Sequence, residues 1–182
     1  KMRSSYWTVP AAEVGRFATN YMIMGDKHSP LDPAATSPFL NPPSFPYGGA
    51  GLVMSARDYD RFLHMLQSYG QLDGVRVMKT ATAKLAMSDL LPEGVEFTGT
   101  EGPTGAKLGF GAGGFVVKAS ADPMIAGAYG WGGAAGTVAW VNPVSKVRGA
   151  IMVNYFPGEK WPIRDETLKA LTSDMTRYGL KR

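Results

Sequence analysis

The chain has 182 residues, of which 45% are hydrophobic and 19% are charged, and it contains no cysteine. Its size and composition fit one packed globular domain and exclude an intrinsically disordered chain. The lack of cysteine excludes disulfides, thiol catalysis and cysteine-ligated metal sites. The net charge of +4 comes from scattered Lys and Arg residues without a basic stripe, so no nucleic-acid partner is expected.

The sequence shows no targeting segment. No apolar run approaches the roughly 20 residues that span a bilayer, so no membrane span is expected. The first residues, Lys1-Met2-Arg3-Ser4, lack the apolar core of a signal peptide. A cytoplasmic and a periplasmic location both stay open.

The first 50 residues are predicted to contain little regular structure. Pro10–Phe17 favours a short helix with Pro10 at its first position, and Phe17–Met24 favours an extended segment. Residues 25–50 contain six prolines. Proline breaks helices and removes donors from strands, so no regular element is expected there. A loop of this length usually has a function or wraps another part of the fold.

The clearest helix is predicted to begin at Ser55. Ser55 and Asp58 have capping-box spacing, with Asp in place of the usual Glu. One apolar stripe follows at i, i+3, i+4 and i+7, formed by Tyr59, Phe62, Leu63 and Leu66. Gly70 ends the helix, and Asp73-Gly74 favours a tight turn between two short extended pieces.

The second half of the chain is predicted to be mainly sheet. A second helix over about Thr82–Leu90 is ended by Pro92, and residues 93–106 are polar and rich in turn residues. Three strands are then expected from their apolar and β-branched residues, near Gly113–Lys118, Ile125–Trp131 and Thr137–Val141.

Two further elements close the chain. Gly149–Phe156 is almost continuously apolar, which is typical of a central strand covered on both faces. Pro162–Tyr178 is predicted to be a terminal helix, with one apolar face formed by Leu168, Leu171, Met175 and Tyr178.

Two motifs resemble known binding or catalytic patterns but lack the neighbouring residues or elements that those patterns require. Residues 109–114 read GFGAGG and match G-x-G-x-x-G, but a dinucleotide site needs a strand before this pattern and a helix after it. Here a polar loop precedes and Phe115-Val-Val follows, so the run is interpreted as a glycine-rich entry to a strand. Lys79-Thr80-Ala81 resembles the start of K-T-G but lacks the glycine, and is interpreted as the lead-in to a helix cap.

The two histidines do not form a recognisable site. His64 follows Leu63 on the predicted helix and is expected at the edge of its buried face. His28 lies near Asp26 and Asp32 in the proline-rich loop, so a Ser–His–Asp triad stays open as an alternative. No serine lies in a G-x-S-x-G elbow, and no ligand pair has helical spacing. Neither a metal nor a cofactor is expected.

The most informative stretch of the chain is residues 129–142. It reads YGWGGAAGTVAWVN, a glycine-rich bend that leads into an apolar strand. Three glycines around Trp131 leave the backbone bare, so a ligand can approach its N–H groups closely. Such donors at a strand edge are what an acyl-transfer enzyme needs to hold a developing oxyanion.

Two blocks resemble the serine β-lactamase-like hydrolases. Residues 48–62 read GGAGLVMSARDYDRF and are similar to that family's G-G-x-G-L-x-S-T-x-x-D-Y-x-R-F block. Residues 130–143 read GWGGAAGTVAWVNP and resemble its third active-site motif. The Trp-Gly-Gly form is typical of the esterase branch, the family VIII carboxylesterases, which are related to class C β-lactamases. Pro42-Pro-Ser-Phe45 and Leu72-Asp-Gly74 also match that branch, so the resemblance covers essentially the whole chain.

The chemistry of that family needs two further motifs, S-x-x-K and Tyr-x-Asn or Ser-x-Asn. No serine of this chain has lysine three residues later, and no Tyr or Ser has Asn two residues later. Both motifs lie upstream of this region in the family. The chain is therefore expected to be the C-terminal portion of one catalytic domain, with the nucleophilic Ser and its Lys or Tyr base in a missing N-terminal segment. Alone it is expected to be inactive.

The resemblance implies acyl transfer, in which a serine attacks an ester or amide carbonyl and the acyl-enzyme is then hydrolysed. Matching Lys-Thr-Gly-Ala to residues 131–134 makes the Ala134 N–H an oxyanion donor, with Gly132 and Gly133 keeping the strand edge clear for substrate. Trp131 stands where the family more often has Lys or His. An indole cannot pair with the carboxylate of a β-lactam, so Trp131 would wall an apolar pocket whose mouth is lined by Tyr47.

The expected function is therefore a serine carboxylesterase that cleaves small esters. Other functions stay open: a β-lactamase or penicillin-binding-type D,D-peptidase activity, a non-catalytic ligand-binding module, and a complete small protein with another activity. Trp140 is expected only to pack in the sheet.

The implied fold is α+β, an antiparallel sheet flanked by helices, with part of a helical domain. Residues 1–106 are expected to be mainly helical and loop, and residues 107–182 to supply three sheet strands and the C-terminal helix. The missing N-terminal segment is the expected partner of this chain and would pair beside Gly149–Phe156. Without it, an exposed strand edge would favour aggregation.

Overall fold

The computed structural model describes residues 1–45, 47–99, 102–103, 105–122 and 125–178. Its centre is a five-stranded antiparallel sheet with the order β11-β10-β9-β8-β7. These strands are β7 (Lys107–Phe110), β8 (Phe115–Ala119), β9 (Tyr129–Gly132), β10 (Val138–Asn142) and β11 (Val147–Ile151).

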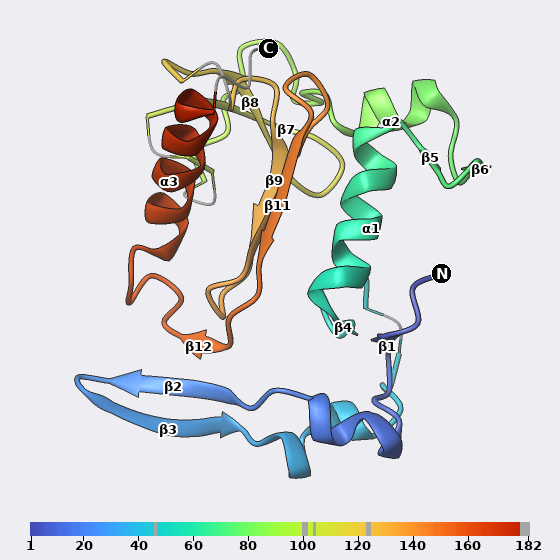
Figure 1. Ribbon diagram of the computed structural model, residues 1–182, viewed down its shortest axis with the longest axis vertical. Helices are drawn as coiled ribbons and strands as arrows, with labels where there is room; N and C mark the ends of the chain where they lie inside the picture. The colour runs from blue at the N-terminus through green and yellow to red at the C-terminus, as the bar shows by residue number, and fades with distance from the viewer. Residues whose placement is uncertain (46, 100–101, 104, 123–124, 179–182) are drawn as a thin grey trace.

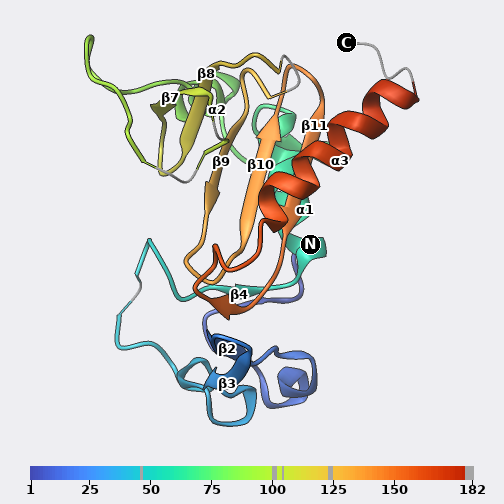
Figure 2. The same ribbon diagram turned by 90° about the vertical axis from the view of Figure 1, so that its left-hand side faces the viewer.

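Helices lie on both faces of this sheet. In Figures 1 and 2, α1 (Ala56–Gln67) and α2 (Thr80–Ala86) lie on one side and α3 (Ile163–Arg177) lies on the other. The predicted α+β fold, with an antiparallel sheet flanked by helices, is thus confirmed. The main sheet has five described strands, of which β8, β9 and β10 fall on the three strands predicted before residue 149, whereas β7 was not predicted.

The first long helix begins where predicted and packs against the sheet with Tyr59, Leu63 and Leu66 of its predicted stripe, whereas Phe62 is 37% exposed. Ser55 Oγ accepts a hydrogen bond from the Asp58 N–H at 3.2 Å, which confirms the N-cap. One core cluster joins this helix to β10, and its buried members are Leu63, Met65, Leu66, Met87, Ala139 and Val141. The helix ends before Gly70, whose φ of +90° suits glycine. His64 is exposed rather than at the edge of the buried face.

The segment after α1 also follows the prediction in outline. Asp73 and Gly74 have positive φ and form the turn between β5 (Gln71–Leu72) and β6 (Val75–Arg76). The second helix ends four residues earlier than predicted, at Ala86. The Ala86 carbonyl accepts a hydrogen bond from the Ala112 N–H at 2.8 Å, which ties the helix end to a distant turn.

The terminal helix is confirmed, and its contact with the sheet is looser than that of α1. No residue of α3 is fully buried. Leu168 packs against a buried cluster of Phe115, Val117, Ile125 and Ala128. Leu171 and Met175 are half-buried, whereas Tyr178 is 68% exposed, so the apolar face ends one turn earlier than predicted.

A second sheet lies beyond one end of the first (Figure 1) and combines distant segments in the order β12-β2-β3. Its strands are β2 (Asn20–Met24), β3 (Lys27–Asp32) and β12 (Tyr155–Phe156). The expectation that residues 25–50 form no regular element was wrong, because β3 pairs with β2 and contains Pro30. β3 is the outer strand of the three, and an edge strand tolerates a residue without an N–H.

The apolar run Gly149–Phe156 is not one central strand, which corrects a second prediction. β11 lies at the edge of the five described strands of the main sheet, and each of its residues is only half-buried. The Asn154 carbonyl accepts a hydrogen bond from the Tyr21 N–H at 3.1 Å. The chain is thereby redirected after Ile151, and Tyr155–Phe156 pairs in parallel with β2.

The glycine run 109–114 forms a β-hairpin, so the expected polar loop before it was wrong. β7 ends at Phe110 and β8 begins at Phe115, and these two residues pair directly. The Gly111 N–H donates to the Gly114 carbonyl at 2.8 Å to close the turn. A strand on each side leaves no helix N-terminus, so the rejection of a dinucleotide site is confirmed.

The remaining described elements are short. The short helix predicted within Pro10–Phe17 is a 3-10 helix over Ala11–Arg16. The others are the 3-10 turns Ala34–Thr36 and Pro38–Leu40, and a small ladder of β1 (Ser5–Tyr6) with β4 (Val53–Met54). Within the described ranges, no helix has the length and apolar character that crossing a membrane requires.

Candidate active site

The hairpin between β9 and β10 presents an unpaired backbone edge. The Gly133 N–H donates to the Thr137 carbonyl at 2.8 Å, and the Gly136 N–H donates to the Gly133 carbonyl at 3.0 Å. Gly136 has a φ of +80°, which closes the tight turn. Because bonded and non-bonded pairs alternate along an antiparallel ladder, the N–H and C=O of Gly132 point away from β10.

The neighbouring strand does not cover this edge. β8 pairs with β9 only as far as Gly130. Beyond that point no described strand pairs with Gly132 on its outer side, and the exposed Ala134 follows in the turn. The Ala134 N–H makes no hydrogen bond within the described part of the chain. The sequence predicted a bare strand edge here, and the register explains which groups it offers.

A groove of about 570 Å³ lies beside this hairpin. One wall consists of Trp131, Gly132, Gly133 and Thr137, and the opposite wall comes from the N-terminal segment and the start of α1, including Ser4, Tyr6, Asn20 and Tyr59. Burial raises the pKa of Tyr59, so its phenol stays neutral near pH 7. The described lining holds no lysine and no histidine, and its carboxylates are those of Glu13 and Asp32.

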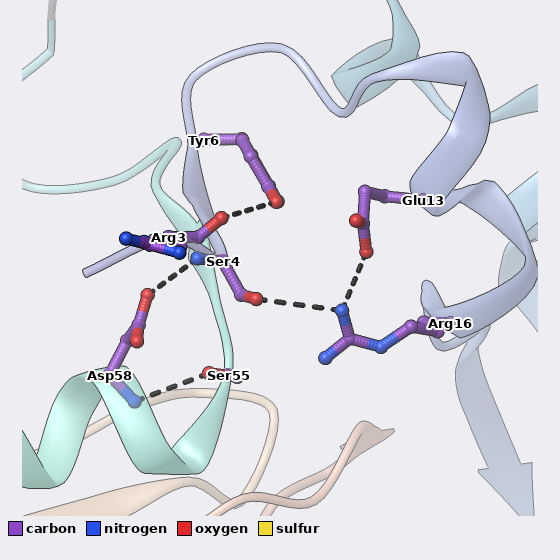
Figure 3. Close-up of polar contacts among 7 residues, drawn as sticks. All are labelled: Arg3, Ser4, Tyr6, Glu13, Arg16, Ser55 and Asp58. Carbon is purple, nitrogen blue, oxygen red and sulfur yellow. Dashed lines mark hydrogen bonds and ion pairs between the residues drawn. The ribbon is translucent and has the colours of Figure 1, made fainter. Parts of the chain in front are cut away.

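A hydrogen-bond network fixes the N-terminal wall of the groove (Figure 3). The buried carboxylate of Asp58 accepts from the Ser4 N–H at 2.7 Å and from Ser5 Oγ at 2.9 Å. Arg16 Nη1 donates to Glu13 Oε2 at 2.6 Å and to Ser4 Oγ at 3.5 Å. The sequence indicated Asp58 only as part of a helix cap, because its other partners lie more than 50 residues away.

Trp131 lies in an aromatic cluster at the rim of the site. It is 38% exposed, and its ring centre lies 5.5 Å from that of Phe110 and 6.1 Å from that of Phe97. Trp131 borders the groove and also a second cavity on the α3 side of the sheet. Its contacts with two phenylalanines make one side of the site apolar.

The two glycines after Trp131 make room for protein side chains. A Cβ at Gly132 would lie 2.8 Å from Arg164 Nη1, and a Cβ at Gly133 would overlap Thr137 Oγ1. Their lack of side chains is therefore explained by close packing as well as by an open strand edge. Trp140 packs closely over Gly149 of β11 and borders the second cavity, in agreement with a packing role.

Tyr47 lies apart from this hairpin. Its ring packs on Phe45, with ring centres 6.1 Å apart, and it is 58% exposed. It lines neither the groove nor the second cavity. The structure therefore brings together Trp131, Gly132, Gly133 and Ala134, but not Tyr47.

A second cavity of about 850 Å³ separates this end of the sheet from α3. Its lining is mainly apolar and includes Phe115, Trp140, Trp161 and Leu168. Arg164, near the start of α3, reaches across and donates from Nη2 to the carbonyls of Gly133 at 3.0 Å and Thr137 at 3.2 Å. No sequence pattern indicated this arginine.

The Ser–His–Asp triad that the sequence left open at His28 is not formed among the described residues. The His28 ring lies against Trp161 at 6.3 Å between ring centres. The carboxylate of Asp32 accepts instead from Ser37 Oγ at 2.9 Å. Across the described residues, no three His, Asp or Glu side chains cluster as metal ligands.

The sequence matches known families and proteins along most of its length. A family model described as Beta-lactamase matches residues 1–174. Two Mycobacterium tuberculosis proteins, Protein Rv1367c and Uncharacterized protein MT1414, are each 33% identical to this chain over 148 residues. Each match covers 75% of this chain and 35% of the relative, so the matched region spans about a third of those relatives.

Three solved structures share the fold. The LovD6 mutant of simvastatin synthase from Aspergillus terreus aligns with a TM-score of 0.77 at 18% identity, over 96% of this chain and 46% of that one. EstCE1, a hydrolase with promiscuous acyltransferase activity, gives 0.67 at 23% identity, over 86% and 43%. A penicillin-binding protein homologue from Caulobacter crescentus gives 0.54 at 20% identity, over 84% and 43%.

Proposed function

Because this chain belongs to the β-lactamase family, we propose that it carries the oxyanion-hole side of a serine hydrolase active site. The whole protein is proposed to be a carboxylesterase that cleaves small esters through an acyl-serine intermediate. The observation that carries the proposal is the unpaired edge after β9, where the Ala134 N–H is free of hydrogen bonds within the described residues and the preceding Gly132 and Gly133 line a groove.

The role of each residue follows from its chemistry. The serine oxygen attacks the ester carbonyl carbon, and the carbonyl oxygen becomes an oxyanion. The Ala134 N–H donates a hydrogen bond to that oxyanion. Loss of one such donor typically costs about 3 kcal/mol of transition-state stabilisation. The Gly132 carbonyl, on the same open edge, can accept a hydrogen bond from a substrate donor.

The nucleophile is proposed to come from residues outside these 182. None of the serines here is followed three residues later by lysine, and the described groove lining offers no lysine base. The groove between Thr137 and the N-terminal wall gives a serine room to approach the hairpin. By this proposal the 182-residue chain alone has an oxyanion donor without a nucleophile and hydrolyses nothing.

The preference for esters rests on Trp131. A β-lactam presents a carboxylate, which a cation would bind, whereas the indole has one N–H donor and no charge. Phe97 and Phe110 pack against the indole, and Trp131 presents an apolar surface where it lines the groove. An apolar wall suits the acyl or alcohol part of a neutral ester.

The test compares two substrates on the full-length protein. A short-chain p-nitrophenyl ester and a chromogenic cephalosporin are assayed side by side, and a fluorophosphonate probe identifies the reactive serine by mass spectrometry. We expect ester hydrolysis to dominate and the labelled serine to lie outside the 182 residues. Absence of labelling, or of any hydrolysis, would contradict the proposal.

A substitution separates the role of Trp131 from that of exposed tryptophans in general. Trp131→Lys restores a cation at the motif position, so the ratio of cephalosporin to ester hydrolysis is expected to rise by about tenfold, as for a gain of ~1.4 kcal/mol. Trp7 is similarly exposed and lines neither cavity. Trp7→Lys is the matched control and should leave the ratio unchanged. An equal ratio in the wild type and Trp131→Lys would rule out the specificity role.

A further inference from the structure

Arg164 holds the same peptide group that carries the proposed oxyanion donor. Its Nη2 donates to the Gly133 carbonyl at 3.0 Å, and this oxygen also accepts from the Gly136 N–H at 3.0 Å. The Gly133 C=O and the Ala134 N–H belong to one planar peptide unit, and in a trans unit they point in opposite directions. The guanidinium is thus bound at one end of the unit, and the N–H is presented at the other.

No carboxylate among the described residues pairs with the charge of Arg164. The ion pairs formed by the described residues do not include Arg164. Its Nε is buried and finds no hydrogen-bond partner in that part of the chain. Its other donor contact among those residues is to the Thr137 carbonyl, in the same turn. The positive charge therefore acts mainly on the carbonyls of the β9–β10 hairpin.

From this geometry we propose that Arg164 is a positioning residue that strengthens the Ala134 N–H as an oxyanion donor. A charge-assisted hydrogen bond draws electron density toward the carbonyl oxygen, and the amide N–H at the other end becomes more polarised. The same contact fixes the orientation of the peptide unit, with its N–H directed away from the guanidinium, while negative charge develops on the substrate. The inference rests on the proposed function, since it assigns Ala134 the role of donor.

Gly132 makes room for the same contact between Arg164 and the hairpin. The guanidinium lies over its Cα, so close that a Cβ would be 2.8 Å from Nη1, 2.9 Å from Nη2 and 3.0 Å from Cζ. A side chain at this position would push Arg164 away from the Gly133 carbonyl. Glycine at this position thus leaves the space that the guanidinium occupies.

The first experiment is kinetic and uses the full-length protein. For Arg164→Met we expect kcat for ester hydrolysis to fall about tenfold, a fraction of the loss caused by removing an oxyanion donor outright, with KM changed less than about twofold. Arg164→Lys keeps the charge and should recover part of kcat. Inactivation by a phosphonate, which places an oxyanion-like oxygen in the same position, should slow in parallel with kcat.

Arg148 provides the matched control. It lies on β11 and donates to Asp60 and Gln67 of α1, away from the groove. Arg148→Met should lower the thermal midpoint without changing kcat. If Arg164→Met retains the kcat of the wild type, or if Arg148→Met lowers kcat equally, the positioning role is overturned.

A second measurement decides the inference without reference to activity. The amide proton of Ala134 is followed by NMR in the labelled full-length protein, in the wild type, Arg164→Lys and Arg164→Met. A polarised N–H resonates downfield, so an upfield shift is expected in Arg164→Met and a smaller one in Arg164→Lys. An unmoved Ala134 signal overturns the inference. A wild type that shows this polarisation but hydrolyses no ester would instead defeat the proposed function alone.

Discussion

The long helices α1 and α3, on opposite faces of the central sheet, contact it differently. α1 buries Leu63, Met65 and Leu66 against β10 and is tied to β11 through Arg148. α3 has no fully buried residue, and it contacts the sheet mainly through Arg164 and Leu168 in its first two turns. The α1 face therefore stabilises the domain, whereas the start of α3 controls the shape of one hairpin.

The largest expected difference between the two faces is in stability. Leu63→Ala removes a side chain that is 3% exposed, and about 3 kcal/mol of unfolding free energy should be lost. Leu171→Ala, on half-buried α3, should cost less than about 1 kcal/mol. Urea unfolding of both variants of the full-length protein measures the two values. Equal losses would show that α3 shares the core after all.

Gly132→Ala tests the contact between the sheet and the start of α3. Overpacking against the guanidinium should cost about 1.5 kcal/mol in the wild-type background. In Arg164→Met the clash is relieved, so the same substitution should cost less than about 0.5 kcal/mol, a coupling that a double-mutant cycle detects. If the cost is the same in both backgrounds, the guanidinium does not set the requirement for glycine.

Ser55→Ala compares how the two helices begin. Ser55 caps α1 through the Asp58 N–H, whereas α3 follows Pro162 without a side-chain cap. Loss of the cap should cost about 1 kcal/mol in unfolding free energy. Ser173→Ala, at an exposed position of α3, is the control and should be neutral within about 0.5 kcal/mol. A destabilising Ser173→Ala together with a neutral Ser55→Ala would reverse the comparison.

The smallest expected effect depends on pH and concerns the loop after α2. The hydrogen bond from Lys118 lowers the pKa of the Asp89 carboxyl, helped by the N–H groups of Phe110 and Leu91. A lowered folded-state pKa stabilises the fold above the unfolded carboxyl's pKa, and this contribution is lost as pH falls through the folded pKa.

Thermal unfolding of Asp89→Asn across pH measures this contribution. The variant should melt below the wild type at neutral pH, and the difference should shrink as the solution is acidified into the carboxyl range. Glu96→Gln is the control, because Glu96 is exposed and its pair with Lys107 at 3.3 Å should contribute little. A constant Asp89→Asn difference at every pH would contradict the assignment.

The features that the sequence predicted correctly depend on neighbours along the chain. The Ser55 cap, the Gly70 stop and the Asp73-Gly74 turn are local, and each was found. β3 was missed because its pairing with β2, rather than its own proline-containing sequence, makes it a strand. Gly149–Phe156 was assigned to one strand because an apolar run does not reveal where the chain changes sheets.

The candidate site likewise has a part that the sequence predicted and a part that it did not. The glycines around Trp131 indicated a bare edge, because glycine weakens a strand and is typical of places where another group approaches the backbone closely. Arg164 carried no such signal, because its contacts to Gly133 and Thr137 span 31 and 27 residues. Only the fold reveals which carbonyls this arginine reaches.

The buried carboxylate of Asp58 has a consequence for motion. It is 5% exposed and holds Ser4 and Ser5 against the start of α1. Lifting these residues would leave a buried charge without two of its donors, at a cost of about 2 kcal/mol for each hydrogen bond. The cost of leaving this charge without its donors therefore keeps the wall of the groove in place. Fluctuations that open the wall should be rare, and the Ser4 amide hydrogen should exchange slowly with solvent.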